Sequence, residues 1–448
     1  MDDLFEKAPI PKAYMQLALP VVLGMLASMI YNLADTFFVA QTGNANLVAG
    51  IALGSPLFSF MLAVGDIFGL GGSAVISRVL GKRNYNLSQR ISSFSLYAAI
   101  ILSLILTALM LVFETPILHL LGANAATMPY IRDFYHVMTL GSTFIIVSLV
   151  PGNIIRTEGL AKLSMVATLS GTLLTLILDP LFLFVCHWGA AGVAFANVLG
   201  YVVNTGLLIY FMRGAKKLSI SPKLAHISRK IIWAVVSIGI PASITNFTQS
   251  FGMMLLNNYL AGYGANAVAA MGIAQKVYLV VMMIMIGFAF GAQPLIGYNY
   301  GAGNHARLRE ILRFDMLIEA GYAFICASIL MLLAPHLIAA FLNQPTIVTQ
   351  GTLMLRALLI TTPFIGLILV FTTVFQSVGA PFSALIMALS RQAVIFAVAL
   401  IVLSHFFGLA GVIWVQAIAD IVTFLIGYSL YRRLHLYKQN DSDAADVS

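Results

Sequence analysis

Long apolar runs, interrupted by short polar turns, fill almost the whole chain. No charged residue occurs in the 22 positions between Lys12 and Asp35, or in the 45 positions between Lys230 and Lys276. Because a membrane-spanning helix needs about 20 predominantly apolar residues, the longer run must hold two helices. Charges and turn residues divide the chain into twelve predicted spans, at 14–38, 48–78, 91–113, 127–152, 161–185, 190–212, 230–258, 266–298, 314–342, 349–377, 383–404 and 409–431.

The composition excludes an ordinary water-soluble protein. Hydrophobic residues make up 60% of the 448 positions and charged residues only 9%, whereas a typical soluble domain carries about 25% charged residues. We therefore predict an all-α polytopic membrane protein. The sequence holds neither a G-x-x-x-x-G-K-[ST] phosphate loop nor an H-E-x-x-H zinc motif. It also offers no nucleophile–base arrangement, so an enzyme is disfavoured and no cofactor is expected.

Lysine and arginine concentrate in every second loop. They cluster after the second, fourth, sixth, eighth and twelfth predicted spans, and the other loops are nearly free of them. The positive-inside rule then places both termini in the cytoplasm, and we expect a multi-pass protein of the cell (plasma or inner) membrane. Basic loops against an anionic leaflet also explain the net charge of +8 without a nucleic-acid partner.

The two halves of the chain resemble each other at a displacement of about 220 residues. The matched stretches are GGSAVISRVLGKRN (71–84) with GAQPLIGYNYGAGN (291–304), Gly159 with Gly379, and GAAGVAFAN (189–197) with GLAGVIWVQ (408–416), the last pair one residue out of register. Since each half holds six spans, both copies enter the membrane in the same direction, as in transporters built from parallel repeats. We predict an N-terminal lobe (1–212), a cytoplasmic linker (213–229), a C-terminal lobe (230–433) and a cytoplasmic tail (434–448).

Two carboxylates distinguish the lobes. Asp35 and Asp179 lie inside predicted spans of the N-terminal lobe, and the repeat places no acid at the matching positions of the other lobe. An unpaired, ionised carboxylate in lipid costs several kcal/mol, so each acid must face a partner or water. Tyr31 and Thr175 precede the two acids by one helical turn on the same helix faces. We predict a cation-coupling site at Asp35 and Asp179; the alternative is that each acid only hydrogen-bonds a neighbouring helix.

Other polar residues inside the spans allow both functional and structural roles. Asp66 fits either role equally well, and Asp420 fits a structural one better. The possible cavity-lining residues are Asn32, Asp66, Asn257, Gln275 and Gln293. The acids predicted to form interfacial pairs with nearby arginines are Glu158 (beside Arg156) and Asp315 and Glu319 (near Arg313). Pro20 in the first span is a predicted hinge, because proline removes a backbone hydrogen bond and kinks a helix.

The chain resembles the multidrug and toxic compound extrusion (MATE) family over essentially its whole length. The motifs that carry the resemblance, beside the twelve spans and the six-plus-six repeat, are LADTFFVA (33–40), GLAK (159–162), LDPLF (178–182) and QPLIGYNYGAGN (293–304). The resemblance implies two six-helix lobes in a V-shaped arrangement. It also implies export of cationic and amphipathic drugs in exchange for protons or sodium ions.

One branch of the family, that of the MepA- and DinF-like exporters, has its coupling acids in the first and fifth helices. By motif position these acids are Asp35 and Asp179 here, with Tyr31 and Pro20 at matching places. The polar partners that the resemblance implies in the fourth, fifth and sixth helices are Asn153, Thr175 and Asn197. The other branch uses acids in its seventh and tenth helices, and the spans 230–258 and 349–377 contain none.

We therefore expect a secondary active multidrug antiporter that acts as a monomer in the lipid bilayer. Its partners would be small-molecule drugs and organic cations, and its coupling ion H⁺ or Na⁺, with a sodium ion held at Asp35 and Asp179. One alternative is a lipid-linked oligosaccharide flippase of the same superfamily, which would want a basic central cavity, whereas the charges inside these spans are mostly acids. Another is a channel or a membrane scaffold, neither of which predicts acids in only one of two repeated lobes.

Overall fold

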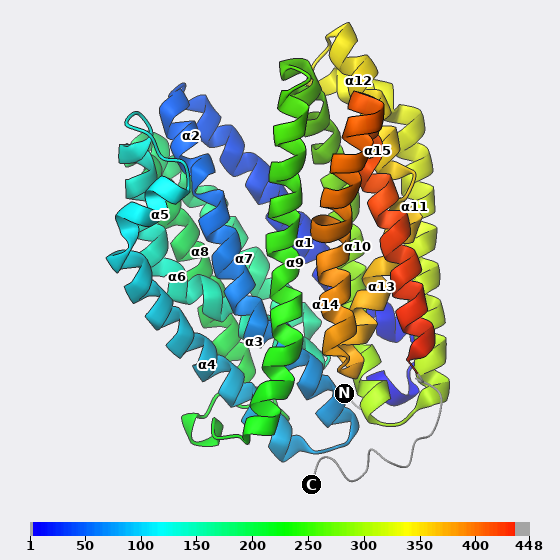
Figure 1. Ribbon diagram of the computed structural model, residues 1–448. Coiled ribbons are helices and arrows are strands. Elements are labelled where there is room, and N and C mark those ends of the chain that lie inside the picture. Colours follow the sequence, from blue (N-terminus) through cyan, green and yellow to red (C-terminus); the bar gives the residue numbers. More distant parts are fainter. Residues whose placement is uncertain (1–2, 435–448) are drawn as a thin grey trace.

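The computed structural model describes residues 3–434, and every regular element within them is a helix (Figure 1). The first half contains η1 (Asp3–Lys7), α1 (Ile10–Gln41), α2 (Ala45–Leu53), α3 (Ser55–Gly81), α4 (Tyr85–Val112), α5 (Glu114–Leu120), α6 (Met128–Thr157), α7 (Ala161–Pro180), η2 (Leu181–Val185) and α8 (Gly189–Arg213). The second half contains η3 (Pro222–Leu224), α9 (Arg229–Ala261), α10 (Ala265–Gly301), α11 (His305–Phe341), α12 (Pro345–Leu359), α13 (Thr362–Val378), α14 (Pro381–Leu389), η4 (Ser390–Val394) and α15 (Ile395–Arg433). The tail predicted at 434–448 lies outside the described residues except for its first position.

The helices account for the twelve predicted spans. Ten segments of the described chain are long and apolar enough to cross a membrane, and the pair α12 and α13, bent by 41°, makes an eleventh. The segment Pro381–Arg433 holds two spans, because Gly408 within it has φ 57° and ψ −135°. Glycine tolerates this conformation, which no helix contains. Leu403 and Gly411 approach each other across the break, so the chain reverses direction there.

Matched positions of the repeat have the same local structure in both halves. Asn84 and Asn304 each accept a hydrogen bond from the backbone N–H three residues later, at the start of α4 and α11 respectively. This contact satisfies one of the N–H groups that a helix start leaves free. Gly159 and Gly379 both have a left-handed backbone, with φ of 83° and 81°, where α6 and α13 end. The two lobes are therefore built on one backbone plan.

The lobes meet at one end of the molecule, which we call the linker end because the segment between α8 and α9 lies there. Here the helices touch backbone to backbone through glycines that leave no room for a side chain. The close contacts are Gly71 with Val235, Gly239 with Ile67, Gly287 with Val22, Gly291 with Ala18 and Gly301 with Arg78. Toward the opposite end the two groups of helices splay apart (Figure 1). There, Leu33 and Phe37 on α1 are 51% and 58% exposed.

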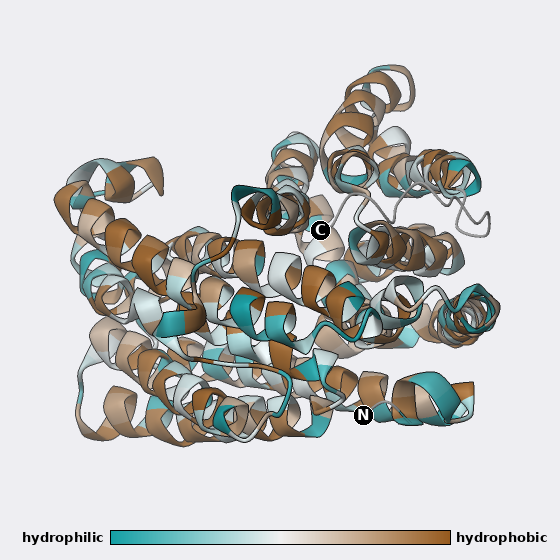
Figure 2. Ribbon diagram, turned by 90° about the horizontal axis from the view of Figure 1, so that it is seen from below, coloured by the Kyte–Doolittle hydropathy of each residue, from teal (hydrophilic) through white to brown (hydrophobic). Residues whose placement is uncertain are grey.

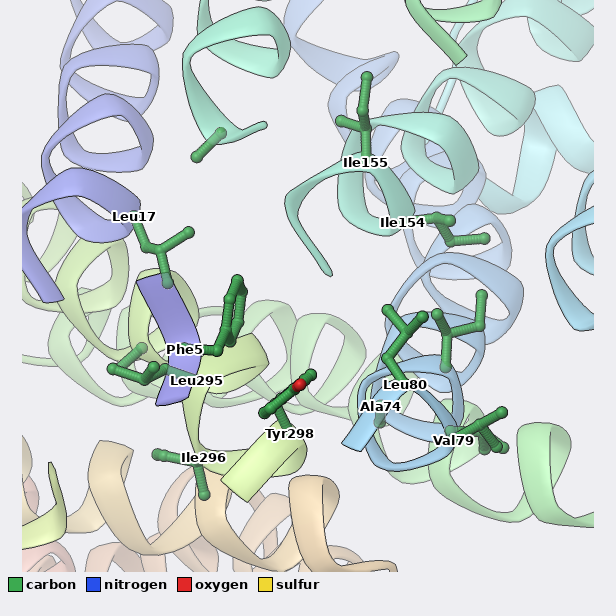
Figure 3. Close-up of a cluster of buried hydrophobic side chains, with 14 of the residues drawn as sticks. Phe5, Leu17, Ala74, Val79, Leu80, Ile154, Ile155, Leu295, Ile296 and Tyr298 are labelled. Carbon is green, nitrogen blue, oxygen red and sulfur yellow. The ribbon is translucent and has the colours of Figure 1, made fainter. Parts of the chain in front are cut away.

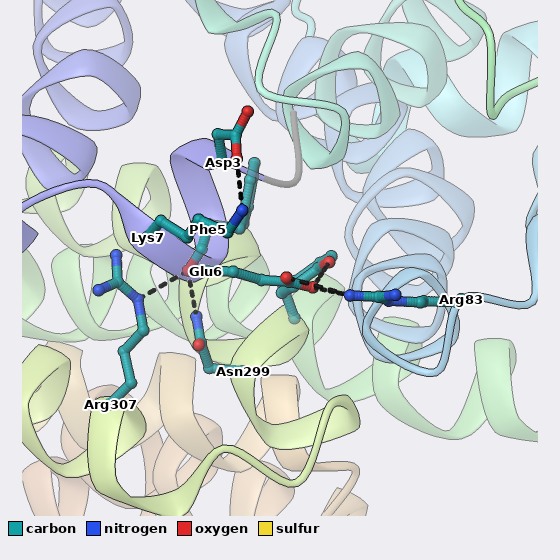
Figure 4. Close-up of polar contacts among 8 residues, drawn as sticks. Asp3, Phe5, Glu6, Lys7, Arg83, Asn299 and Arg307 are labelled. Carbon is teal, nitrogen blue, oxygen red and sulfur yellow. Dashed lines mark hydrogen bonds and ion pairs between the residues drawn. The ribbon is translucent and has the colours of Figure 1, made fainter.

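The N-terminal segment η1 is bound to both lobes at the linker end. Phe5 is completely buried in a hydrophobic cluster to which both lobes contribute (Figure 3). Its backbone carbonyl accepts hydrogen bonds from Asn299 and Arg307 of the C-terminal lobe (Figure 4). Glu6 pairs with Arg83 of the N-terminal lobe at 3.2 Å. The segment thus connects the two lobes where they already touch.

The linker itself belongs to the surface of the N-terminal lobe. Ser92 and Tyr97 of α4 donate hydrogen bonds to the backbone carbonyls of Ser219 and Ile220 in the linker. Seen from the linker end, most of the helical ribbon is hydrophobic, with smaller hydrophilic stretches between (Figure 2). This distribution is what a protein embedded in lipid requires.

Candidate cation-coupling site

The two acids predicted for coupling meet between α1 and α7. Asp35 lies in the last third of α1, and Asp179 is followed by Pro180, the last residue of α7. Asp179 is completely buried and Asp35 half-buried, and their carboxyl groups lie near enough to interact with each other. No basic side chain among residues 3–434 forms an ion pair with either acid. Such a pair becomes stable when it shares a proton or binds a cation.

Tyr31, predicted for this site, lies beside both carboxyl groups. Asn197 on α8 lies near Tyr31, and its amide donates to the backbone carbonyl of Val193 on its own helix at 3.2 Å. Tyr201, one turn after Asn197, also lies near Tyr31, and the sequence analysis missed it. Thr175 is buried on α7, where its hydroxyl donates to the carbonyl of Gly171 at 3.0 Å.

Asn153 belongs to a different polar group. Its side-chain oxygen accepts a hydrogen bond from Arg156 at 3.4 Å. Asp66, on α3, interacts electrostatically with Arg156 and accepts a hydrogen bond from Asn246 of α9 at 3.1 Å. Across the described chain, no hydrogen bond joins these residues to the carboxyl pair of α1 and α7. The group instead connects the N-terminal lobe with α9 of the other lobe.

The remaining cavity candidates differ in their surroundings. Asn32 and Asn257 are exposed, and Gln275 is half-buried. Gln293 is buried inside the C-terminal lobe, where its amide donates to Gln376 at 3.0 Å. The first three therefore have side chains at the surface of the helix bundle, whereas Gln293 links α10 to α13.

Pro20, the predicted hinge, is buried within α1, which runs as one helix from Ile10 to Gln41. Its neighbours Ala18 and Val22 contact glycines of α10. Pro20 therefore lies at the level where α1 is held against the C-terminal lobe, below the part of α1 that carries Asp35.

Within the described residues, the C-terminal lobe holds a buried acid that, unlike Asp35 and Asp179, is paired with a base. Asp420 is completely buried and forms an ion pair with Arg391 of η4 at 2.9 Å. Gln416 and Thr361 donate to the same carboxylate at 2.8 and 3.0 Å, and Arg391 donates to the hydroxyl of Tyr278 at 3.1 Å. This network agrees with the structural role predicted for Asp420. The sequence analysis missed Arg391, although a charge inside the apolar span 383–404 was the available signal.

The predicted pairing of Asp315 and Glu319 with Arg313 is wrong. Both acids are completely buried, and neither forms an ion pair with any base in the part of the chain that the structure describes. The reason is that α11 begins at His305, nine residues before the predicted span at 314. The acids therefore lie inside the helix bundle instead of at its surface.

The predicted pairing of Glu158 with Arg156 is also wrong. The Glu158 carboxylate accepts hydrogen bonds from the backbone N–H groups of Lys216 and Lys217 in the linker, at 3.0 and 2.9 Å. Burial raises the pKa of Glu158, and these two N–H groups oppose the shift because they favour the ionised form. Arg156 donates instead to Ser164 at 3.2 Å. Glu158 thus fastens the linker to the N-terminal lobe.

Similarity to known proteins identifies the family. The profile of the MatE family matches residues 20–181 and again 241–403, one copy in each lobe and at the displacement of the repeat. The chain belongs to the MATE family. Among MATE relatives, the multidrug export protein MepA of Staphylococcus aureus (strain NCTC 8325 / PS 47) is 32% identical over 436 residues, which cover 96% of each chain. MepA of Staphylococcus haemolyticus (strain JCSC1435) is 32% identical over 440 residues, which cover 97% of each chain.

Solved MATE structures have the same fold. One, described as the outward-facing conformation of a multidrug resistance MATE family transporter, matches with a TM-score of 0.90 at 25% identity and covers 97% of this chain and 98% of that chain. A transporter of the MOP superfamily from Pyrococcus furiosus matches with a TM-score of 0.90 at 25% identity, covering 97% of both chains. The predicted family and the predicted two-lobed, twelve-helix fold are thereby confirmed.

Proposed function

We propose that this MATE protein exports cationic and amphipathic compounds in exchange for H⁺ or Na⁺, through the carboxyl pair Asp35–Asp179. The observation that carries the proposal is the pair itself. Two acids lie together in the spanning part of one lobe, and no base within residues 3–434 neutralises them. The relatives named multidrug export protein MepA support the export of drugs.

The linker end faces the cytoplasm in this proposal. The basic loops of the chain lie at that end, and basic loops remain on the cytoplasmic side of a membrane protein. Because the lobes are joined at the linker end and splay apart at the other (Figure 1), the conformation is outward-open. The coupling pair is then reached from outside the cell.

The carboxyl pair couples ion uptake to substrate release through its charge. In the outward-open state Asp35 and Asp179 take up protons, which removes their attraction for a cationic substrate. The first helix bends near Pro20 and the substrate leaves to the outside. The return to an inward-open state exposes the pair to the cytoplasm, where the protons leave. Tyr31 lies beside both carboxyl groups during uptake.

Transport of a cationic dye into or out of proteoliposomes tests the proposal. An imposed pH gradient and an imposed sodium gradient are compared in separate experiments, and the gradient that drives the dye identifies the ion. We expect Asp35→Asn and Asp179→Asn to abolish gradient-driven transport, because an amide neither takes up a proton nor carries a charge. Asp133→Asn, at an exposed acid of α6, is the matched control and should transport normally. Full coupled transport by the variant that lacks both acids would overturn the proposal.

A further inference from the structure

A second carboxyl pair lies on α11 in the C-terminal lobe. Asp315 and Glu319 are one helical turn apart and completely buried. Tyr14 of α1, in the other lobe, is also completely buried and donates a hydrogen bond to Oδ1 of Asp315 at 2.8 Å. No side chain of the described chain donates a hydrogen bond to Oδ2 of Asp315 or to either carboxylate oxygen of Glu319, and the backbone of Ala289 on α10 lies close to Glu319. The pair therefore has more acceptor atoms than the surrounding protein satisfies.

No base in the described part of the chain compensates this pair. Phe288 of α10 and Phe314 of α11 pack against the Tyr14 ring, with centroids 6.3 and 5.2 Å away, and Gly366 of α13 packs against the backbone of Glu319. The titratable groups that face the two acids are Tyr14 from α1 and Tyr322 from α11 itself. Within residues 3–434, the parts of α10 and α13 at this site contribute no charged side chain.

The electrostatics of the pair require a proton. Two carboxylates one turn apart, both completely buried and with no base of the described chain beside them, cannot both be ionised. The hydrogen bond from Tyr14 stabilises a negative charge on Asp315. The proton therefore resides on Glu319, to which no side chain donates such a bond.

We propose that Asp315 and Glu319 form a second proton-binding site, which Tyr14 closes only while the lobes are joined at the linker end. When the lobes separate there, α1 carries Tyr14 away, water reaches the pair, and Glu319 releases its proton on that side. The displacement of the repeat places Ser95 and Ala99 at the matching positions of α4, so this site exists in the C-terminal lobe alone. Its place in a transport cycle depends on the proposed function, whereas its occupancy by a proton does not.

Infrared spectroscopy of the reconstituted protein tests the occupancy. All substitutions are made in the Asp35→Asn/Asp179→Asn variant, which lacks the infrared signal of the first carboxyl pair. The measurement does not depend on transport activity. At neutral pH we expect a carbonyl-stretch band of a protonated carboxyl group that disappears on Glu319→Gln and shifts in frequency on Tyr14→Phe. Glu310→Gln, at an exposed acid on the same helix, should leave the band unchanged. The proposal fails if Glu319→Gln removes no band, or if Tyr14→Phe leaves the band where it was.

Distances between the lobes test the link to opening. Spin labels are placed on exposed positions of the linker end by Asn86→Cys and Ala306→Cys, in the same background and with Cys186→Ser and Cys326→Ala. In this proposal the conformation with a joined linker end binds a proton at Glu319. Low pH therefore favours that conformation, and its population falls as the pH rises. We therefore expect the distance distribution to shift to longer values with rising pH, and Glu319→Gln to abolish that shift. An equal pH response with and without Glu319 would overturn the inference, even if the first pair proves essential for transport.

Discussion

Asp179 in the N-terminal lobe and Asp420 in the C-terminal lobe are both completely buried in spanning helices, yet their surroundings are opposite. Asp420 receives hydrogen bonds from Arg391, Gln416 and Thr361. Asp179 has no base beside it in the described chain and lies against a second acid. A compensated carboxylate is fixed in one charge state and holds helices together. An uncompensated one gains stability by taking up a cation, which makes it useful for transport.

The largest effect on stability should come from replacing Asp420, the acid whose charge Arg391 neutralises. We expect Asp420→Asn to lower the stability of the protein by about 3–5 kcal/mol, because it leaves the buried Arg391 without its counter-charge. The midpoint of thermal unfolding in detergent measures this effect. Asp179→Asn should leave the midpoint unchanged or raise it, since it removes an uncompensated carboxyl group. Equal losses in the two variants would contradict the distinction between the two acids.

Removing both partners of the ion pair should be less harmful than removing one. We expect the double variant Asp420→Leu/Arg391→Met to recover most of the stability that Asp420→Asn loses, because apolar replacement of a buried ion pair is often neutral or stabilising. The same unfolding measurement checks it, with Arg391→Met alone as the comparison. If the double variant is as unstable as Asp420→Asn, then the remaining hydrogen bonds of the network, and not charge compensation, stabilise this region.

The smallest effect should be the same in both lobes. Asn84→Ala and Asn304→Ala each remove a side chain that caps the start of a helix, at matched positions of the repeat. Each should cost about 1 kcal/mol, seen as a small decrease of the unfolding midpoint, and gradient-driven transport should continue. If the two substitutions lowered stability by markedly different amounts, the matched positions would share a backbone conformation but differ in the stability that the cap contributes.

The number and order of the spans were predictable because a bilayer demands about 20 apolar residues for each helix. The ends of the helices were less predictable. The helix α11 starts at His305, since its first turns are held by the N-terminal segment and not by lipid, and apolarity alone does not report such contacts. The division at charges and turn residues placed a boundary between the predicted spans 383–404 and 409–431, and the chain reverses at Gly408 within that boundary.

The pairing of the buried acids was only partly predictable. Asp35 and Asp179 were found together because they occur in one lobe alone and match the family's motifs. The contacts of Asp420 with Arg391 and of Asp315 with Tyr14 join residues 29 and 301 positions apart. Only the folded bundle brings these side chains together, so periodicity along the chain gives no sign of them.

The anchored N-terminal segment has a practical consequence for anyone who labels this protein. Phe5 is completely buried between the lobes, and burying a phenylalanine side chain is worth about 1.5–3 kcal/mol. That energy corresponds to a population ratio of roughly tenfold or more in favour of the joined linker end. An affinity tag or fluorescent protein fused ahead of Phe5 would lie next to this contact between the lobes. Measurements of conformational equilibrium should therefore leave the amino terminus untagged.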